Sequence, residues 1–224
     1  MLCCTRQELE EFLSGGLILD NIAAEHLCSM GYGDLIGCTC DGRITQPCTE
    51  QLCCPEYAGA WNETLMCVDW PSARRQGAWI SHLTQDPAAQ ELTRLLDEEK
   101  RYLGPGMIRF SNRLGGDICV MAAPVSDLGW ISKGRSVLMR SLLSRMPQET
   151  PLPFVGGDMN LAPFYYRSGE GWGLLGIVNC GLDPAAAVLP EGLEYQCLSH
   201  PQDPEGLTLP PVSVKLYRIT RKEA

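Results

Sequence analysis

The hydrophobic pattern is most regular over residues 117–146. An apolar run of strand length, residues 118–123, comes first, and a loop containing Pro124 and Gly129 follows it. Four apolar residues then recur at i, i+3, i+4 and i+7, the period of an amphipathic helix; they are Met139, Leu142, Leu143 and Met146. Strand, loop and helix in this order form half of an α/β unit, and open α/β sheets hold their ligands at the carboxyl ends of strands.

The N-terminal part predicts a helix, a strand and a second helix. Thr5 and Glu8 have the spacing of a capping box, which places the start of a helix at this point. Residues 17–19 form a short apolar strand, and Asp20 is suited to cap a helix over residues 22–30. Because no strand precedes the first helix, we expect an α/β sheet that lacks its early strands. We therefore expect the C-terminal portion of a longer protein, or a short relative of one.

The middle of the chain is less regular. Residues 38–60 have no sustained period and are interpreted as loop or short edge strands. Pro87 is well placed at the first position of a helix, and the spacing of Leu92, Leu95 and Leu96 predicts that this helix runs to about residue 102.

After Met146 the pattern changes to short apolar or alternating runs separated by Gly, Pro and Asp. These runs are residues 163–167, 172–179, 194–198 and 212–219. Such a series is typical of a small antiparallel sandwich. The predicted fold class is therefore α/β: a partial, open flavodoxin- or amidotransferase-like α/β domain over residues 1–148, followed by a small antiparallel β-sandwich domain over residues 149–224.

Composition narrows the classes of partner and the compartment. The chain has 224 residues, 45% of them hydrophobic, and a formal net charge of −9. This charge argues against nucleic acid and anionic membrane as partners, because both require clustered Lys and Arg. No apolar run approaches the roughly 20 residues of a membrane span. The N-terminus has no basic and apolar signal-peptide pattern, so we expect a cytoplasmic protein.

Cysteine is concentrated at the N-terminal end. Nine of the twelve cysteines lie at or before residue 67: Cys3, Cys4, Cys28, Cys38, Cys40, Cys48, Cys53, Cys54 and Cys67. Reduced thiols, a metal site and disulfides are all compatible with this cluster. The usual paired C-x2-C motif of zinc sites is absent. We therefore predict no metal site and no cofactor.

Several short motifs together resemble a known family. They are the Ser-Asp-Leu-Gly-Trp loop at 126–130, Leu-Leu-Ser-Arg-Met at 142–146, Tyr166-Arg167 and the glycine-punctuated strand at 171–179. Their order is similar to the C-terminal half of family-42-type β-galactosidases and related glycoside-hydrolase-like proteins. In that half, an amidotransferase-like trimerisation domain precedes a small β domain. The resemblance covers most of residues 9–37 and 103–190.

The resemblance implies a chain without catalytic residues. In these enzymes the two catalytic glutamates lie in a preceding barrel, which a chain of this length does not contain. The G-x-C-x-G elbow of true amidotransferases and the G-x-S-x-G motif of hydrolases are both absent. Asp158 and Glu170 are a candidate carboxylate pair for glycoside hydrolysis, but a turn role explains Asp158 more simply.

Three hypotheses remain open. The first is a non-catalytic scaffold whose partner is a homo-oligomer or a catalytic barrel domain. The second is a carbohydrate-binding module, in which Trp130, Tyr166 or Trp172 stacks on a sugar face. The third is a small thiol-dependent hydrolase, for which Cys28 or Cys38 with His26 would be the first candidates.

Overall fold

The parts of the chain that the computed structural model describes are residues 5–67, 79–124, 133–146, 156–158, 160–167, 172–189, 193–199 and 207–221. The chain divides into two compact units, Met1–Glu149 and Thr150–Ala224, which we call unit 1 and unit 2.

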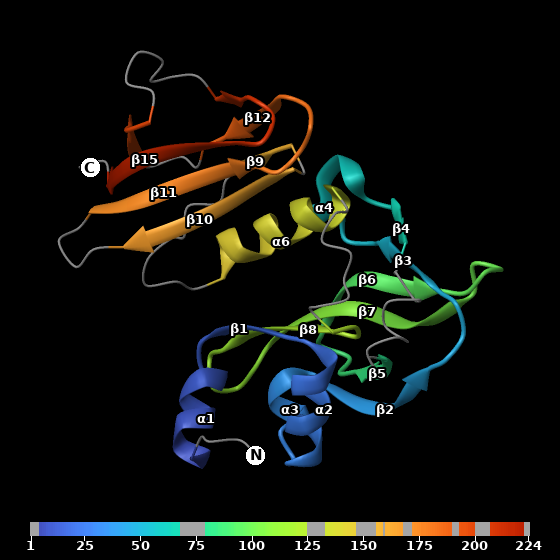
Figure 1. The fold of residues 1–224 in the computed structure, drawn as a ribbon. Helices are drawn as coiled ribbons and strands as arrows, with labels where there is room; N and C mark the ends of the chain where they lie inside the picture. The colour runs from blue at the N-terminus through green and yellow to red at the C-terminus, as the bar shows by residue number, and fades with distance from the viewer. Residues whose placement is uncertain are drawn as a thin grey trace. The chain divides into compact units, whose positions relative to one another are not determined.

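Unit 1 is built around a six-stranded sheet (Figure 1). Its strands are β1 (Gly16–Leu19), β3 (Thr49–Leu52), β4 (Leu65–Cys67), β6 (Gln90–Leu96), β7 (Tyr102–Ser111) and β8 (Asp117–Met121). They lie in the order β1-β8-β7-β6-β3-β4. A separate sheet pairs β2 (Cys38–Ile44) with β5 (Ile80–Gln85) in antiparallel fashion.

Helices lie on both sides of this sheet. They are α1 (Arg6–Leu13), α2 (Asn21–Ser29), α3 (Gly33–Ile36), α4 (Pro55–Ala58) and α6 (Lys133–Arg145), together with the 3-10 helix η1 (Gly59–Trp61). In Figure 1, α1, α2 and α3 lie on one side of the sheet, and α4 and α6 lie on the other. Every residue of β8 is buried as a result, which explains its continuous apolar run.

The predicted fold class is wrong for this unit. A flavodoxin-like region needs a parallel sheet whose neighbouring strands are joined through helices. Here β1 and β8 are the only parallel pair among the described strands, and β6, β7 and β8 follow one another as antiparallel neighbours. The protein is mostly β, with several sheets and few helices.

The helix predicted from residue 87 to about 102 is also wrong, because this stretch forms β6 and the turn after it. Three register shifts interrupt the pairing of β6 with β7. Leu92 and Thr93, and then Leu95 and Leu96, are therefore buried as adjacent pairs. Bulges of this kind break the alternation of a strand, and the resulting spacing imitates a helical period.

The helix, strand and helix predicted for the N-terminal part are confirmed. Thr5 and Glu8 form the capping box of α1, with the Thr5 amide donating to Glu8 Oε2 at 2.7 Å. Residues 16–19 form β1, and the Asp20 side chain accepts from the Ala23 amide at the start of α2. The strand and the helix predicted within residues 117–146 are present as β8 and α6; residues 125–132 between them lie outside the described residues.

One buried asparagine fastens the turn between β7 and β8 to two helices. Asn112 Nδ2 donates to the carbonyl oxygens of Leu13 (2.8 Å) and Leu35 (2.9 Å), at the ends of α1 and α3. Its Oδ1 accepts from the amides of Leu114 and Gly116 at 2.9 and 3.0 Å. A single side chain thus satisfies four backbone groups, three of them in buried hydrogen bonds: the carbonyl oxygens of Leu13 and Leu35 and the Gly116 amide.

Unit 2 is antiparallel. One sheet has the order β10-β11-β15-β13 and the other the order β14-β12-β9. The bounds are β9 (Gly156–Gly157), β10 (Leu161–Arg167), β11 (Trp172–Asn179), β12 (Ala185–Val188), β13 (Leu193–Cys197), β14 (Thr208–Leu209) and β15 (Ser213–Arg221). Both sheets contribute to one core, which includes Leu175, Ala187 and Leu209. The four runs predicted as strands after residue 160 are confirmed as β10, β11, β13 and β15.

Candidate functional site

The first candidate site lies where the parallel strands β1 and β8 end, which is where ligands bind in open α/β sheets. Asn21 begins α2 directly after β1, and its Nδ2 donates to the Trp79 carbonyl oxygen at 2.8 Å and to Ser81 Oγ at 3.1 Å. The Ser81 amide donates to the Ala122 carbonyl oxygen, just beyond the end of β8. These bonds fix the start of β5 against the carboxyl ends of both strands.

A carboxylate completes this polar group. Glu25 lies one helical turn after Asn21, and its Oε1 accepts from both Trp79 Nε1 and Ser81 Oγ, at 2.5 Å each. The guanidinium carbon of Arg43 lies 3.9 Å from the centre of the Trp79 ring, a cation–π contact. Glu25 is thereby held in one orientation by side chains that lie more than fifty residues away in the sequence.

Glu25 and Arg43 line a pocket of about 610 Å³ between α2 and β2. The other lining residues are Cys28, Ser29, Thr39, Cys40, Asp41 and Gly42. This volume is within the range of sites for small molecules. The lining combines carboxylates, a guanidinium and thiols.

Three thiols meet beside the pocket. The Sγ atoms of Cys28 and Cys40 lie 3.8 Å apart, and Cys28 Sγ lies 3.4 Å from the carbonyl oxygen of Cys38. Hydrogen bonding with the side chains of Cys38 and Cys40 lowers the pKa of Cys28. The same contacts with Cys28 raise the pKa values of Cys38 and Cys40. This hydrogen bonding favours the thiolate of Cys28.

Two of the three residues predicted for a thiol hydrolase, Cys28 and Cys38, lie in the thiol cluster, and no hydrogen bond in the described part of the chain joins His26 to it. Cys28 and Cys38 are close together, but the thiol-hydrolase hypothesis requires one of them to lie beside His26. His26 is exposed, and no hydrogen bond among the described residues links a histidine to either thiol. A cysteine nucleophile is normally activated by an adjacent general base, and His26 does not supply one here.

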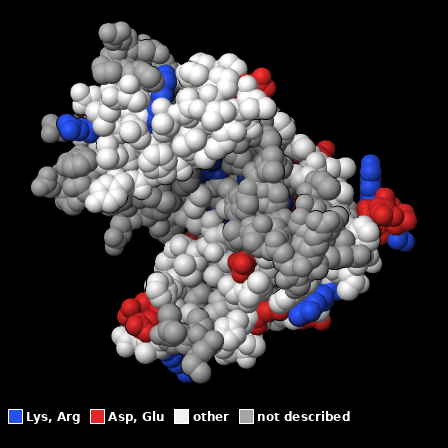
Figure 2. All heavy atoms as spheres, in the orientation of Figure 1, with Lys and Arg blue, Asp and Glu red and all other residues white. Residues whose placement is uncertain are grey.

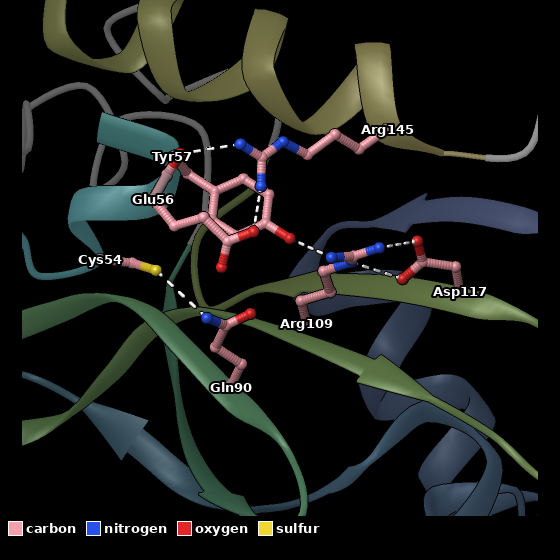
Figure 3. Close-up of polar contacts among 7 residues, drawn as sticks. All are labelled: Cys54, Glu56, Tyr57, Gln90, Arg109, Asp117 and Arg145. Carbon is pink, nitrogen blue, oxygen red and sulfur yellow. Dashed lines mark hydrogen bonds and ion pairs between the residues drawn. The ribbon is translucent and has the colours of Figure 1, made fainter. Parts of the chain in front are cut away.

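A second polar cluster lies around Tyr57 in α4 (Figure 3). Arg109 forms a bidentate ion pair with Asp117, with Nε–Oδ1 and Nη2–Oδ2 distances of 2.7 and 2.5 Å, and also donates to the Tyr57 hydroxyl. Arg145 lies over the Tyr57 ring, 4.5 Å from its centre, and pairs with Glu56. The carboxylate of Asp117 raises the pKa of Arg109. These contacts join α4, α6 and the sheet, and we assign the cluster a structural role.

The predicted carbohydrate residues have different outcomes. Trp130 lies outside the described residues, and Trp172 is placed only as the first residue of β11. Tyr166 lies in β10 and is 64% exposed. Phe164, two residues earlier, is 50% exposed and lies on the same face, because side chains alternate along a strand. Phe164 is not among the residues predicted from the sequence, because no local motif marks it as a partner of Tyr166.

The candidate carboxylate pair is not established. Asp158 Oδ2 accepts from the Ala186 amide at 2.7 Å, a contact with the edge of β12 that fits a turn role. Glu170 lies outside the described residues. Within the described ranges, no group of three or more His, Cys, Asp or Glu side chains is arranged to hold a metal ion.

Two observations concern nucleic acid and membrane, which the net charge argues against as partners: the distribution of basic side chains and the length of the helices. On the face shown in Figure 2, the described Lys and Arg side chains lie in small, separate groups. None of the described helices is both long and apolar enough to cross a membrane.

No family model and no curated protein matches the chain. Among solved structures, Gan42B, a GH42 β-galactosidase from G. stearothermophilus, is similar with a TM-score of 0.52 and 12% identity over 96% of this chain and 30% of that one. A β-galactosidase from Bacillus circulans sp. alkalophilus is similar with a TM-score of 0.52 and 12% identity, over 95% and 30%.

The α-L-fucosidase isoenzyme 2 from Paenibacillus thiaminolyticus has a TM-score of 0.56 and 13% identity, over 100% of this chain and 39% of its own. This chain shares its fold with part of these glycoside hydrolases. It spans between 30% and 39% of their length.

Proposed function

We propose that this chain is a non-catalytic structural module of a glycoside-hydrolase-like protein, and that it acts by assembling with copies of itself. The observation that carries this proposal is the extent of the fold similarity. Nearly the whole chain, both units included, corresponds to less than two fifths of each similar enzyme. The resemblance of its motifs to the half of such enzymes that follows the barrel supports the same assignment.

The topology of the described strands supports a module separate from a catalytic barrel. A (β/α)8 barrel needs eight parallel strands that alternate with helices. The described strands include one parallel pair, β1 with β8, and are otherwise antiparallel. The active-site geometry of such a barrel is therefore not built from the described residues of this chain.

The test is an assay of the purified full chain for hydrolysis of chromogenic galactosides and fucosides. We expect no turnover above a buffer control. Turnover that co-purifies with the chain would overturn the proposal. If that turnover disappears on thiol alkylation and in a Cys28→Ser variant, the thiol-dependent hydrolase is the correct alternative.

One observation favours carbohydrate binding as a second function. Phe164 and Tyr166 lie side by side on the outer face of β10, at a separation of about 7 Å. The ring of Phe164 lies over Gly176 in the neighbouring strand β11, where a Cβ atom would overlap it. Tyr166 is paired with Leu174 in β11, and Leu174 is paired with Arg218 in β15. Exposed aromatic faces are suited to stacking on sugar rings.

Titration of the chain with galactosides, followed by NMR or calorimetry, tests this second function. We expect saturable binding that Tyr166→Ala and Phe164→Ala each weaken. Val212→Ala is the matched control, because Val212 is also exposed but lies in the turn that precedes β15. Equal binding by all three variants would exclude this face as the sugar site.

A further inference from the structure

Two half-buried thiols from different elements are in contact at the pocket beside α2. Cys28 lies in the last turn of α2, and Cys40 lies in β2. Their Sγ atoms are 3.8 Å apart, and both residues line the pocket of about 610 Å³. A small molecule in this pocket therefore has access to both sulfur atoms at once.

The third thiol is in a different position. Cys38 precedes Cys40 by two residues in β2, so both side chains lie on one face of the strand. Cys38 is only 3% exposed and is absent from the pocket lining. It supports Cys28 by hydrogen bonding and, unlike Cys40, is not accessible from the pocket.

We propose that Cys28 and Cys40 are a peroxide-reactive thiol pair, in which Cys28 is oxidised first and Cys40 then joins it in a reversible disulfide. A disulfide needs a sulfur–sulfur distance of about 2.05 Å, so the two atoms must approach by less than about 2 Å. The disulfide would link α2 to β2 and close the segment of residues 28–40.

The chemistry is balanced with hydrogen peroxide as the oxidant. The Cys28 thiolate attacks one peroxide oxygen, the O–O bond breaks, and the departing hydroxide takes a proton from solvent to become water. Cys28 is now a sulfenic acid. The Cys40 sulfur then attacks Cys28 Sγ, the S–O bond breaks, and the Cys40 proton leaves with the hydroxide as a second water. Two thiols are oxidised by two electrons, and one peroxide is reduced.

The position of Cys28 supports its role as the attacking thiol. Cys28 lines the pocket and lies 3.8 Å from the Cys40 sulfur, and hydrogen bonding within the cluster lowers its pKa toward the reactive thiolate. Arg43 contributes positive charge to the same pocket, although Glu25 and Asp41 oppose it. Cys180, by contrast, is exposed, lies in unit 2, and has no second thiol in contact among the described residues.

The experiment is to treat the reduced full chain with one equivalent of hydrogen peroxide, block the remaining thiols and map the links by mass spectrometry. Cleavage before Asp34 and Asp41 separates Cys28 from a short peptide that contains both Cys38 and Cys40. Fragmentation at Thr39 then identifies the partner. We expect a Cys28–Cys40 link that a thiol reductant removes.

Two variants and one control strengthen the test. Cys40→Ser should leave Cys28 as a sulfenic acid that dimedone traps, and Cys28→Ser should abolish the link. Cys180→Ser should form the link as the unchanged chain does. A Cys28–Cys38 link, or the absence of any link from Cys28 in the folded unchanged chain, would overturn the proposal. The mapping of the unchanged chain does not depend on whether any variant folds.

Discussion

Glu50 and Arg135 form a buried ion pair that offers a direct test of the packing in unit 1. Glu50 lies in β3 and Arg135 in α6, and both side chains are 3% exposed. Thr93 Oγ1 donates to the other carboxylate oxygen of Glu50 at 2.5 Å. Burial lowers the pKa of Arg135 to about 10, so it stays charged at neutral pH. Its Nη1 is buried and has no hydrogen-bond partner among the described residues.

The expected magnitude follows from the cost of leaving one charge alone in the interior. Removing one partner of a buried ion pair costs about 3–5 kcal/mol, because the remaining charge is then neither solvated nor paired. Glu50→Gln and Arg135→Met should each lower the free energy of unfolding by about this amount. In the double variant no unpaired charge remains, so we expect it to lose at least about 2 kcal/mol less than the sum of the single losses.

Urea unfolding followed by circular dichroism measures these changes, provided the slope with denaturant stays constant. Glu10→Gln is the matched control, because Glu10 pairs with Arg6 on the exposed side of α1 and should cause no measurable change. A loss below about 1 kcal/mol for Glu50→Gln would refute the reasoning. Additive losses in the double variant would refute it equally.

Three further predictions concern unit 1. Asn112→Ala should cost about 3 kcal/mol in urea unfolding, because it leaves buried backbone groups without partners, and a loss below about 1 kcal/mol would contradict this. The Thr5 amide and hydroxyl lower the pKa of Glu8 from 4.5, so the bond stabilises α1 above that pH and is lost as pH falls through the lowered pKa. An NMR titration should give a Glu8 midpoint below 4.5 that Thr5→Ala raises; an unshifted midpoint would contradict it. Gly116→Ala should lower the melting temperature because its Cβ would overlap a backbone oxygen of α1, whereas Gly42→Ala, with open space around it, should not.

Local signals in the sequence were sufficient where neighbouring residues determine the structure. The capping box of Thr5 and Glu8 and the Asp20 cap act within three residues, and they place α1 and α2 correctly. The strand β8 was also predicted correctly. It is buried on both faces, so its apolar residues follow one another without interruption in the sequence. Turn residues likewise separated the strands of unit 2.

Signals that depend on pairing between distant strands were misread. Bulges in β6 placed its leucines at helical spacing, and only the register with β7 shows that they belong to a strand. The class prediction failed for a related reason. The parallel strands β1 and β8 are each followed by a helix in the sequence, which is the strand–helix order of an α/β unit. The antiparallel pairing of β8 with β7 is a contact between strands, and the order of elements does not show it.

The candidate site was predicted only in part. Cys28 and Cys38 were singled out as candidate nucleophiles with His26, and the structure brings Cys40 to them through the alternation of β2. Glu25 was not singled out, because its partners Trp79 and Ser81 lie more than fifty residues away. No local sequence pattern predicts a contact between residues so far apart in the chain.

Self-assembly of the chain is tested most directly by its absolute molar mass in solution. Light scattering on the full chain, with and without a thiol reductant, measures this mass against 24.6 kDa for one copy. We predict a mass of two or three copies that the reductant leaves unchanged. A mass of one copy at every concentration, or an assembly that the reductant dissolves, would contradict the proposed structural module.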